Sequence, residues 1–162
     1  MTKTELLELI RNGENSGVEF KRDVVQNFDL AKELVAFTNS DGGHVLLGID
    51  DDGSVSGLTR GDIAEWVMTT CRTKIRPEII PYFEIVRDVE PGKDIAVVSV
   101  EEGWTVHSRW HDNHSTYYIR VGSLSREAST EELARLLQQR GAFRVRFALC
   151  RDHRSRNWTA DG

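Results

Sequence analysis

One short segment, residues 45–49 (VLLGI), constrains the fold more than any other part of the chain. Nearly every side chain in it is large and apolar, and a strand of that kind has to be covered on both faces. Turn-forming clusters enclose it, DGG at residues 41–43 and DDDG at residues 50–53, where glycine supplies the positive φ of a tight turn. The sequence therefore predicts a buried strand at the centre of a sheet.

Helical patterns recur around this strand, and two of them begin at capping boxes, Thr2 with Glu5 and Ser129 with Glu132. In each box a hydroxyl side chain at the helix start is followed three residues later by a glutamate. Apolar residues then recur at helical spacing and form one stripe, which indicates packing against a core. The predicted helices are residues 2–12, 28–38, 63–74 and 129–139.

Segments with alternating or β-branched residues predict the other strands. In residues 17–21 (GVEFK), the alternation puts Val18 and Phe20 on the core side and Glu19 and Lys21 on the opposite face. Further strands are expected at residues 54–58, as an antiparallel partner of the central strand, at 82–86 and 95–100, as a hairpin, and at 117–121. Helices interspersed with hairpins predict an α+β fold, in which helices pack on a mixed or antiparallel sheet.

Charge is distributed unevenly along the chain. The whole chain carries −5, but residues 137–162 hold six arginines against two aspartates, a net +4. We therefore expect one domain over residues 1–140 and a basic extension over residues 141–162. An acidic body with a basic tail is a recurring pattern in chains that bind nucleic acid, although the net charge argues against coating of duplexes in general. The alternatives are a solvated tail without a partner or, since residues 141–150 alternate like a strand, a tail that adds to a sheet or a partner.

No apolar run comes near the roughly 20 residues that a membrane helix needs, and no apolar signal core follows Met1. We therefore expect a cytoplasmic protein without a membrane partner. Cys71 and Cys150 lack the spacing of a metal or redox pair, and Cys71 falls on the apolar face of a predicted helix. Three histidines fall in a polar segment that we interpret as a loop without a metal site: His107, His111 and His114.

Carboxylates gather near two of the predicted strands. Glu14 lies in the loop before the first strand, Glu19 lies on that strand, and residues 50–52 (DDD) follow the central strand. If the two strands are neighbours, three carboxylates meet on one patch, where mutual repulsion favours a shared cation. Oxygen ligands suit Mg²⁺ or Mn²⁺, and such an ion can activate water for hydrolysis of a phosphodiester, with Lys21 offsetting phosphate charge. The alternative is an exposed hairpin turn beside ordinary surface glutamates.

Three sequence blocks resemble the signature motifs of Schlafen domains. Residues 14–21 (ENSGVEFK) are similar to the family's E-x-x-x-x-E-F-K motif. Residues 36–51 (AFTNSDGGHVLLGIDD) are similar to its A-F-A-N-T-x-G-G-x-hydrophobic-G-V-D-D block, and residues 117–123 (YYIRVGS) to its Y-x-R-x-G-S strand. The blocks occur in the order and spacing expected of the family, which makes the resemblance specific.

The resemblance to the Schlafen Alba-type domain implies binding of nucleic acid, often ahead of helicase-like or winged-helix segments in transcriptional regulators. In a subset of animal members a Glu, Glu, Asp triad makes the domain a metal-dependent nuclease that cleaves transfer and ribosomal RNA. Those positions match Glu14, Glu19 and Asp51, with Asp50 as a near match. The resemblance thus implies that these three residues are catalytic and bind Mg²⁺ or Mn²⁺.

The chain also departs from those nucleases. They form a basic cleft from two tandem copies of the domain, whereas this chain holds one, so a cleft would require a homodimer or an attached partner. The family's Cys/His zinc site has no counterpart in this sequence. No G-x-x-x-x-G-K-[ST] motif occurs either, so no ATP site is expected.

Basic and aromatic side chains supply the expected contacts to nucleic acid: Lys21, Arg22, Arg109, Arg120 and Arg126 for phosphates, and Trp104 and Trp110 for stacking on unpaired bases. The tryptophans could instead hold a loop in place. The leading hypothesis is a nucleic-acid-binding domain, with divalent-metal-dependent endoribonuclease activity on structured RNA such as tRNA kept open. The second is a non-catalytic DNA-binding module of a transcriptional regulator, and the third is a protein-interaction module.

Overall fold

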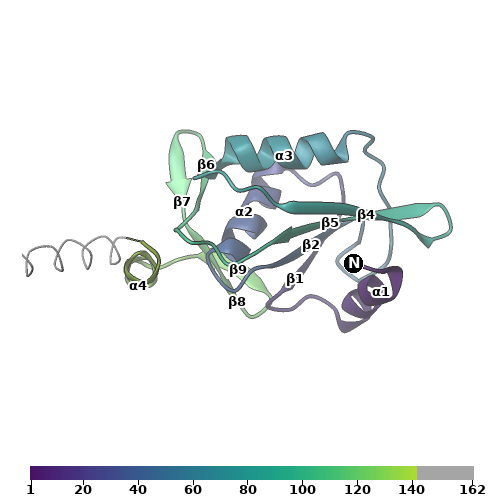
Figure 1. Ribbon diagram of the computed structural model, residues 1–162, viewed down its shortest axis with the longest axis horizontal. Helices are drawn as coiled ribbons and strands as arrows, with labels where there is room; N and C mark the ends of the chain where they lie inside the picture. Colours follow the sequence, from purple (N-terminus) through teal and green to yellow (C-terminus); the bar gives the residue numbers. More distant parts are fainter. Residues whose placement is uncertain (142–162) are drawn as a thin grey trace, which may run out of the picture.

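A central sheet with helices on both faces organises the computed structural model, which describes residues 1–141 (Figure 1). The helices are α1 (Lys3–Asn12), α2 (Asn27–Thr38), α3 (Ile63–Lys74) and α4 (Thr130–Arg140). The strands are β1 (Val18–Lys21), β2 (Gly43–Leu47), β3 (Ile75–Arg76), β4 (Tyr82–Glu90), β5 (Lys93–Val100), β6 (Ser108–His111), β7 (His114–Thr116), β8 (Tyr118–Val121) and β9 (Leu124–Glu127). The central sheet has the strand order β1-β2-β5-β4, and the smaller sheets are β3-β6-β7 and β8-β9. The α+β fold predicted from the sequence is confirmed.

Strand β2 lies inside the central sheet, as its apolar sequence predicts. It runs parallel to β1 on one side and antiparallel to β5 on the other. The chain leaves this ladder at Gly48, whose φ of 104° suits a residue without a side chain. The large side chains of the strand have no solvent exposure: Val45, Leu46 and Leu47.

Two apolar layers enclose the central sheet. On one face α2 and α3 pack against it, for example through Leu34 and Val67. On the other face α1 packs against it through Leu6, which is fully buried. Successive residues of β5 alternate between the two layers, so that Val97 belongs to the α1 side and Val98 to the α2 and α3 side.

Both predicted capping boxes form. The Thr2 side chain accepts a hydrogen bond from the backbone N–H of Glu5, whose carboxylate in turn accepts one from the Thr2 backbone. Ser129 and Glu132 form the same reciprocal pair at the start of α4. These helix starts follow from local sequence alone, because every partner lies within three residues.

The segment that we predicted to be a polar loop with three histidines contains a hairpin, formed by β6 and β7. Asp112 and Asn113 form its turn, and both have positive φ, 49° and 57°, as a two-residue hairpin turn requires. Strand β9, which we did not predict, pairs with β8 across a turn at Gly122, where φ is 58°. These strands are short and polar, so hydrophobic periodicity does not separate them from loops.

Residues 54–58 do not form the predicted antiparallel strand. Strands β1 and β5 occupy both edges of β2, so residues 54–58 can pair only with the chain beyond the end of β2. They form a single bridge there, between Ile49 and Val55. The predicted tight turn is confirmed by a 2.9 Å hydrogen bond from the Gly53 backbone N–H to the Asp50 carbonyl.

The predicted basic extension lies outside the described residues, apart from Gly141. The division into a domain of residues 1–140 and an extension therefore stays a prediction. Within residues 1–141, no helix combines the length and the apolar character needed to cross a membrane.

Candidate functional site

A buried ion-pair network, made of Glu19, Lys21, Glu33 and Arg120, joins β1 to α2 and β8. Arg120 Nη1 lies 2.8 Å from Glu19 Oε2 and 3.3 Å from Glu33 Oε2. Lys21 Nζ lies 2.7 Å from Glu19 Oε1 and 3.7 Å from Glu33 Oε1. The Arg120 side chain is only 1% exposed. Two acids thus meet two cations, one fully buried and one half-buried, and buried charges require such partners.

Arg120 also fastens the β8-β9 hairpin to the edge of the sheet. Its Nη2 donates to the backbone carbonyls of Asn15 and Val18, at 2.8 and 3.2 Å. Its Nη1 donates to Ser125 Oγ at 3.0 Å, and the guanidinium carbon lies 4.8 Å from the ring centroid of Phe37. A single side chain from β8 thus contacts the loop before β1, β1 itself, α2 and β9.

The strand alternation predicted for β1 is confirmed, but the face that carries Glu19 is not open to solvent. Glu19 and Lys21 share one face, and Phe20 packs in the α1 layer on the other. Because α2 supplies Glu33 and the β8-β9 hairpin supplies Arg120 over this face, Glu19 is only 7% exposed. Alternation identifies which residues share a face, and tertiary packing decides what covers that face.

The network shifts the pKa of two of its members. Burial and the charge of Glu19 raise the pKa of Glu33, although Ser125 and Lys21 oppose that shift. Burial by itself lowers the pKa of Lys21, but the hydrogen bond to Glu19 and the charges of Glu19 and Glu33 outweigh it, so the pKa is raised. Lys21 is therefore held as a cation, whereas the charged form of Glu33 is disfavoured by folding.

The other predicted acids have separate roles. Glu14 Oε1 accepts a hydrogen bond from the backbone N–H of Phe20 at 2.9 Å, which holds the loop before β1 against the strand. Asp52 accepts hydrogen bonds from the backbone and hydroxyl of Ser54 and stabilises the turn after β2. Asp51 is exposed in the same turn. The structure therefore gives Glu14 and Asp52 local backbone roles and leaves Asp51 at the surface.

In this arrangement the acids of the described chain form no assembled site for a divalent ion. Residues 1–141 contain no group of three or more His, Cys, Asp or Glu side chains that could hold a metal ion. Both carboxylate oxygens of Glu19 already face cations, Lys21 and Arg120. Glu14, Glu19 and Asp51 as metal-binding catalytic residues therefore stay a prediction from the family resemblance.

Four of the five cations expected to contact nucleic acid form ion pairs with acids of the same chain. The pairs are Lys21 with Glu19, Arg22 with Asp50, Arg120 with Glu19 and Glu33, and Arg126 with Glu132. Arg126 makes two hydrogen bonds to the carboxylate of its partner, at 2.8 and 3.0 Å. Arg120 lies in the interior, so in this fold it cannot meet a phosphate as we expected.

The fifth cation, Arg109, belongs to the first of two aromatic–cation groups, which together we call the aromatic–cation patch: Arg109 with Phe28, Lys32 and Tyr118, and Arg76 with Trp110. Because Arg109 and Trp110 are successive residues of β6, the two groups lie on opposite faces of the β3-β6-β7 sheet. The guanidinium carbon of Arg109 lies 4.9 Å from the ring centroid of Tyr118 and 5.9 Å from that of Phe28. Arg76 lies 4.0 Å from the ring centroid of Trp110, and Lys32 Nζ lies 5.7 Å from that of Tyr118. The patch thus places three cations on aromatic rings.

The cations of the patch lie outside the ion pairs of the described chain. No acidic side chain of residues 1–141 forms an ion pair with Lys32, Arg76 or Arg109. Arg109 Nε is buried without a hydrogen-bond partner. A cation–π contact orients a cation but does not neutralise it, unlike an ion pair. Cations beside aromatic rings are a combination that single-strand binding surfaces use, and Phe28 and Trp110 are the partly exposed rings of the patch, since Tyr118 is buried.

The patch assembles from elements that are distant in sequence. Strand β3 pairs with β6, with Arg76 opposite Ser108, and this pairing brings Arg76 to Trp110. Sequence reasoning identified Arg109 and Trp110 but missed Lys32 and Arg76. Each missed residue is a single basic residue in a helix or a two-residue strand, and no local pattern marks it.

The remaining candidate residues have structural environments. Cys71 is buried, and burial raises its pKa to about 12, so its thiol is unreactive, as expected for a small core residue. His107 lies in the loop before β6, as predicted, and is buried there with Nδ1 2.6 Å from the Pro77 carbonyl oxygen. Trp104 is 83% exposed and lies outside the aromatic–cation patch.

Comparisons with known proteins agree with this fold. The DIP2311 protein from Corynebacterium diphtheriae has a similar structure, with a TM-score of 0.60 and 18% identity over 77% of this chain. That match covers 24% of the DIP2311 chain, so this chain spans only a fraction of that protein. The N-terminal domain of a RecG-related protein from Nitrosomonas europaea, named for an ATP-dependent DNA helicase, has a TM-score of 0.56 and 23% identity over 80% of this chain and 94% of its own. A search of curated proteins found no match.

At these identities the two structures show a shared fold. The family model described as "Schlafen, AlbA_2" matches residues 14–129, which is more than half of the chain. The matched range includes all three sequence blocks that resemble Schlafen domains, and it spans the buried network and the aromatic–cation patch. The chain belongs to the Schlafen, AlbA_2 family.

Proposed function

We propose that the chain binds nucleic acid through the aromatic–cation patch. The observation that carries this proposal is that Lys32, Arg76 and Arg109 lie beside aromatic rings and form no ion pair within the described chain. Family membership supports the same class of ligand, and one of the similar structures is a domain of a protein named for its relation to a DNA helicase.

The chemistry of the patch favours unpaired strands. A guanidinium group offers two parallel donors to a phosphate, and its plane can also stack on an exposed base. Three cations make a small electrostatic footprint, and the net charge of −5 works against wrapping a long duplex. We therefore expect a short single strand to bind more tightly than a duplex of the same length.

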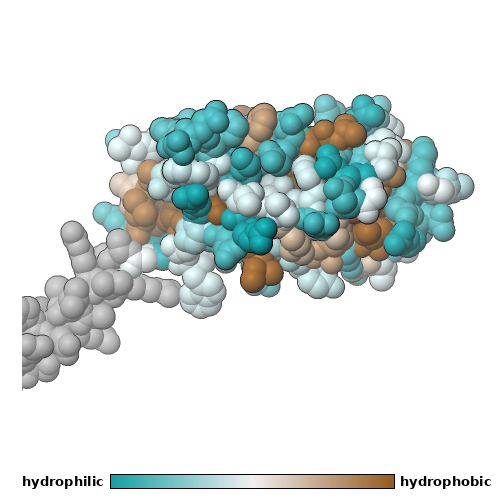
Figure 2. Space-filling model, turned by 90° about the horizontal axis from the view of Figure 1, so that it is seen from above, coloured by the Kyte–Doolittle hydropathy of each residue, from teal (hydrophilic) through white to brown (hydrophobic). Residues whose placement is uncertain are grey.

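The surface over α3 carries no single large hydrophobic patch. Figure 2 shows that side as mostly hydrophilic, with hydrophobic side chains in separate small patches. The fully buried centre of a stable protein interface is richer in apolar surface than that.

Fluorescence anisotropy with a labelled oligonucleotide at several salt concentrations tests the proposal. For three phosphates on a single strand, log K should fall with log salt with a slope of about −2. Replacing two of the cations, in Arg76→Ala/Arg109→Ala, should weaken binding at least tenfold and reduce the slope to about −0.7.

The matched control is Arg87→Ala/Arg135→Ala, which removes two exposed arginines that lie outside the patch. This variant changes the net charge by the same amount, so any effect of overall charge should appear in both. Equal loss of affinity in the two double variants would overturn the assignment of the patch. Unchanged binding by Arg76→Ala/Arg109→Ala would also overturn it.

Cleavage of the bound strand by a divalent ion on Glu14, Glu19 and Asp51 is a finer proposal that rests on the family resemblance. The clean variant is Asp51→Ala, because Asp51 is exposed, whereas Glu19→Ala also breaks the buried network. Structured RNA such as a tRNA is incubated with the protein and Mn²⁺, or with EDTA. Metal-dependent cleavage that Asp51→Ala abolishes would support the catalytic proposal. RNA that stays intact with the unsubstituted protein and Mn²⁺ would rule the catalytic proposal out. Sedimentation of the same protein tests the homodimer that a two-copy cleft requires.

A further inference from the structure

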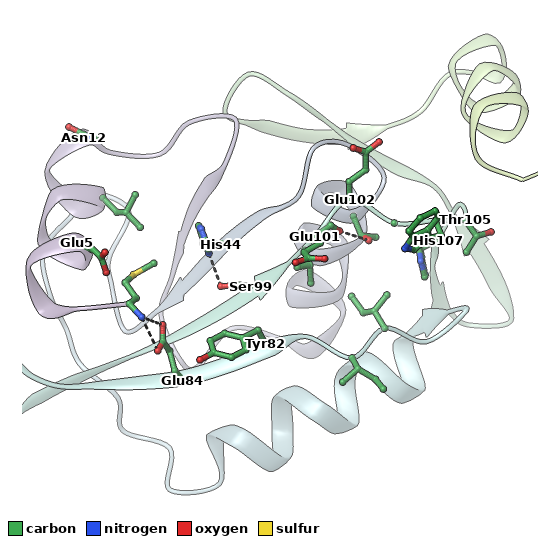
Figure 3. A pocket seen from close by; sticks show the side chains of 18 of the residues that line it. Glu5, Asn12, His44, Tyr82, Glu84, Ser99, Glu101, Glu102, Thr105 and His107 are labelled. Carbon is green, nitrogen blue, oxygen red and sulfur yellow. Dashed lines mark hydrogen bonds and ion pairs between the residues drawn. The ribbon is translucent and has the colours of Figure 1, made fainter.

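A groove lies on the face of the central sheet that α1 covers only in part (Figure 3). Its volume is about 1060 Å³, and its lining comes from α1, from β4 and β5, and from residues 101–107. His44 and Ser99 stand opposite each other in the β2-β5 register and are joined by a 2.6 Å hydrogen bond within the groove. Leu6 of α1 packs on a neighbouring part of the same face and does not line the groove.

The groove is acidic at neutral pH. Five glutamates line it: Glu5, Glu8, Glu84, Glu101 and Glu102. Glu8 and Glu101 form no ion pair within residues 1–141, and the Met1 amino group pairs with Glu84. Burial lowers the pKa of both histidines in the groove, His44 and His107, so they add no positive charge. A phosphate is repelled from such a surface, and a cationic ligand is attracted to it.

Large apolar side chains stand beside these carboxylates. Ile80 is 91% exposed and Tyr82 is 66% exposed, and both line the groove. Tyr82 lies on β4, the edge strand of the central sheet. A ligand that satisfies this surface has to carry both positive charges and apolar groups, as a basic and partly apolar peptide does.

The chain leaves α4 at the rim of this groove. Arg140, the last residue of α4, donates to the carbonyls of Thr38 and Gly103 and pairs with Glu102 at 3.0 Å. All three of these partners line the groove. The chain that follows Gly141 therefore begins beside the groove.

The sequence of that following segment matches the groove in charge and polarity. Residues 142–162 hold five arginines against two aspartates, a net +3, while the described part of the chain is acidic. In residues 143–149 (FRVRFAL), arginines alternate with apolar residues. At roughly 3.3–3.6 Å per residue when extended, the segment has ample length to reach along the groove.

We infer that residues 142–162 dock in the acidic groove of the same chain, with arginines beside Glu8 and Glu101 and apolar side chains against Ile80 and Tyr82. In this state the arginines of the segment are occupied by carboxylates and are withheld from phosphates. The inference does not depend on the aromatic–cation patch, because it rests on the glutamates of the groove, and none of the patch residues lines the groove.

The chain contains a natural probe for this contact, Cys150. Cys71 is buried with a raised pKa, so a thiol-reactive nitroxide on the full-length, ¹⁵N-labelled protein is directed to Cys150. Docking predicts selective broadening of amide signals from groove residues such as Ser99 and Glu101. Amides of α3, which contributes nothing to the groove, should keep their intensity.

Charge reversal in the groove tests the cause of the contact. Glu8→Lys/Glu101→Lys should abolish at least half of the broadening, and high salt should do the same. The control Glu65→Lys alters an exposed glutamate of α3 and should leave the broadening intact. Broadening that is uniform over the protein, or unchanged by Glu8→Lys/Glu101→Lys, would overturn the inference. A mixing experiment tests for a second copy: a ¹⁵N-labelled Cys150→Ser chain without nitroxide is mixed with a spin-labelled chain that carries no ¹⁵N. Broadening in the ¹⁵N-labelled chain would also overturn the inference, because a second copy would then be the occupant.

Discussion

The buried network and the aromatic–cation patch both contain arginines, but the arginines have different roles in the two regions. Arg120 is 1% exposed and contacts two carboxylates, two backbone carbonyls and an aromatic ring. Arg109 and Arg76 contact aromatic rings and have no acidic partner in residues 1–141. The first arrangement consumes the positive charge in holding the fold together, and the second orients the charge and keeps it available.

This contrast shows that an arginine's role depends on what surrounds it in the fold. Arg120 lies in a motif that resembles a family signature, and we expected it to contact phosphate. Its burial makes it a structural residue that docks the β8-β9 hairpin on β1 and α2. Arg76 belongs to no motif and nevertheless lies in the patch.

The largest effect is expected from Arg120→Ala. This substitution leaves Glu19 and Glu33 buried with Lys21 as their remaining partner, and breaking a buried pair in this way costs about 3–5 kcal/mol of unfolding free energy. Urea denaturation measures the loss. Arg109→Ala, as the comparison variant, should change stability much less, and a loss below about 1 kcal/mol in Arg120→Ala would contradict the contrast between the two regions.

A smaller effect, on binding and not on stability, is expected from Arg76→Ala. Loss of one charge-assisted contact to phosphate should weaken single-strand affinity by about 1.5 kcal/mol, measured by anisotropy. Arg60→Ala is the matched control, since Arg60 also rests on a tryptophan, 4.4 Å from the ring centroid of Trp66, but outside the patch. Similar losses in both variants would mean that any arginine on an aromatic ring serves equally well.

The buried network also predicts an unusual pH dependence. The pKa of Glu33 is raised by burial and by Glu19, so between the ordinary value of 4.5 and the raised value the folded state holds a proton that the unfolded state has lost. Stability in that window should therefore fall as pH rises. Unfolding midpoints measured across this range should show the slope in the wild type, and Glu33→Gln should flatten it. If Glu33→Gln leaves the slope unchanged, a different titrating group causes the pH dependence of stability.

The smallest effect is expected at the exposed pair of Arg126 and Glu132. Hydrogen bonds from Arg126 and Ser129 lower the pKa of Glu132 to about 2. The stability that this carboxylate contributes is present above 4.5 and is lost as pH falls toward about 2, the opposite sign to Glu33. In acid unfolding measurements the free energy of unfolding should fall gently as pH drops below 4.5, and Glu132→Gln should remove that fall. A steep fall would mean that this pair stabilises the fold more than exposed ion pairs usually do.

The predictability of the fold follows the range of the interactions involved. Features that depend on neighbours in sequence could be predicted: the capping boxes, the alternation in β1 and the apolar run of β2. The β6-β7 hairpin was missed because polar strands carry little periodic signal. Residues 54–58 failed to form a strand because β2 had no free edge, which is a property of the whole sheet.

The candidate site was less predictable than the fold. Glu19 and Lys21 were correctly placed on one face, but Glu33 and Arg120, which cover that face, lie far away in sequence. The groove likewise depends on how little of one sheet face α1 covers, and no local pattern carries that information.

By itself, the sequence determined the helix starts, the central strand, the α+β class and the resemblance to a family, because these depend on residue type and spacing. Only the tertiary structure decided which charges are cancelled and which remain, because neutralisation requires atoms within about 4 Å of one another. Residues 45–49 constrain the fold in the same way: their apolar character demands cover on both faces, and the packing of α1 on one side and α2 and α3 on the other supplies it.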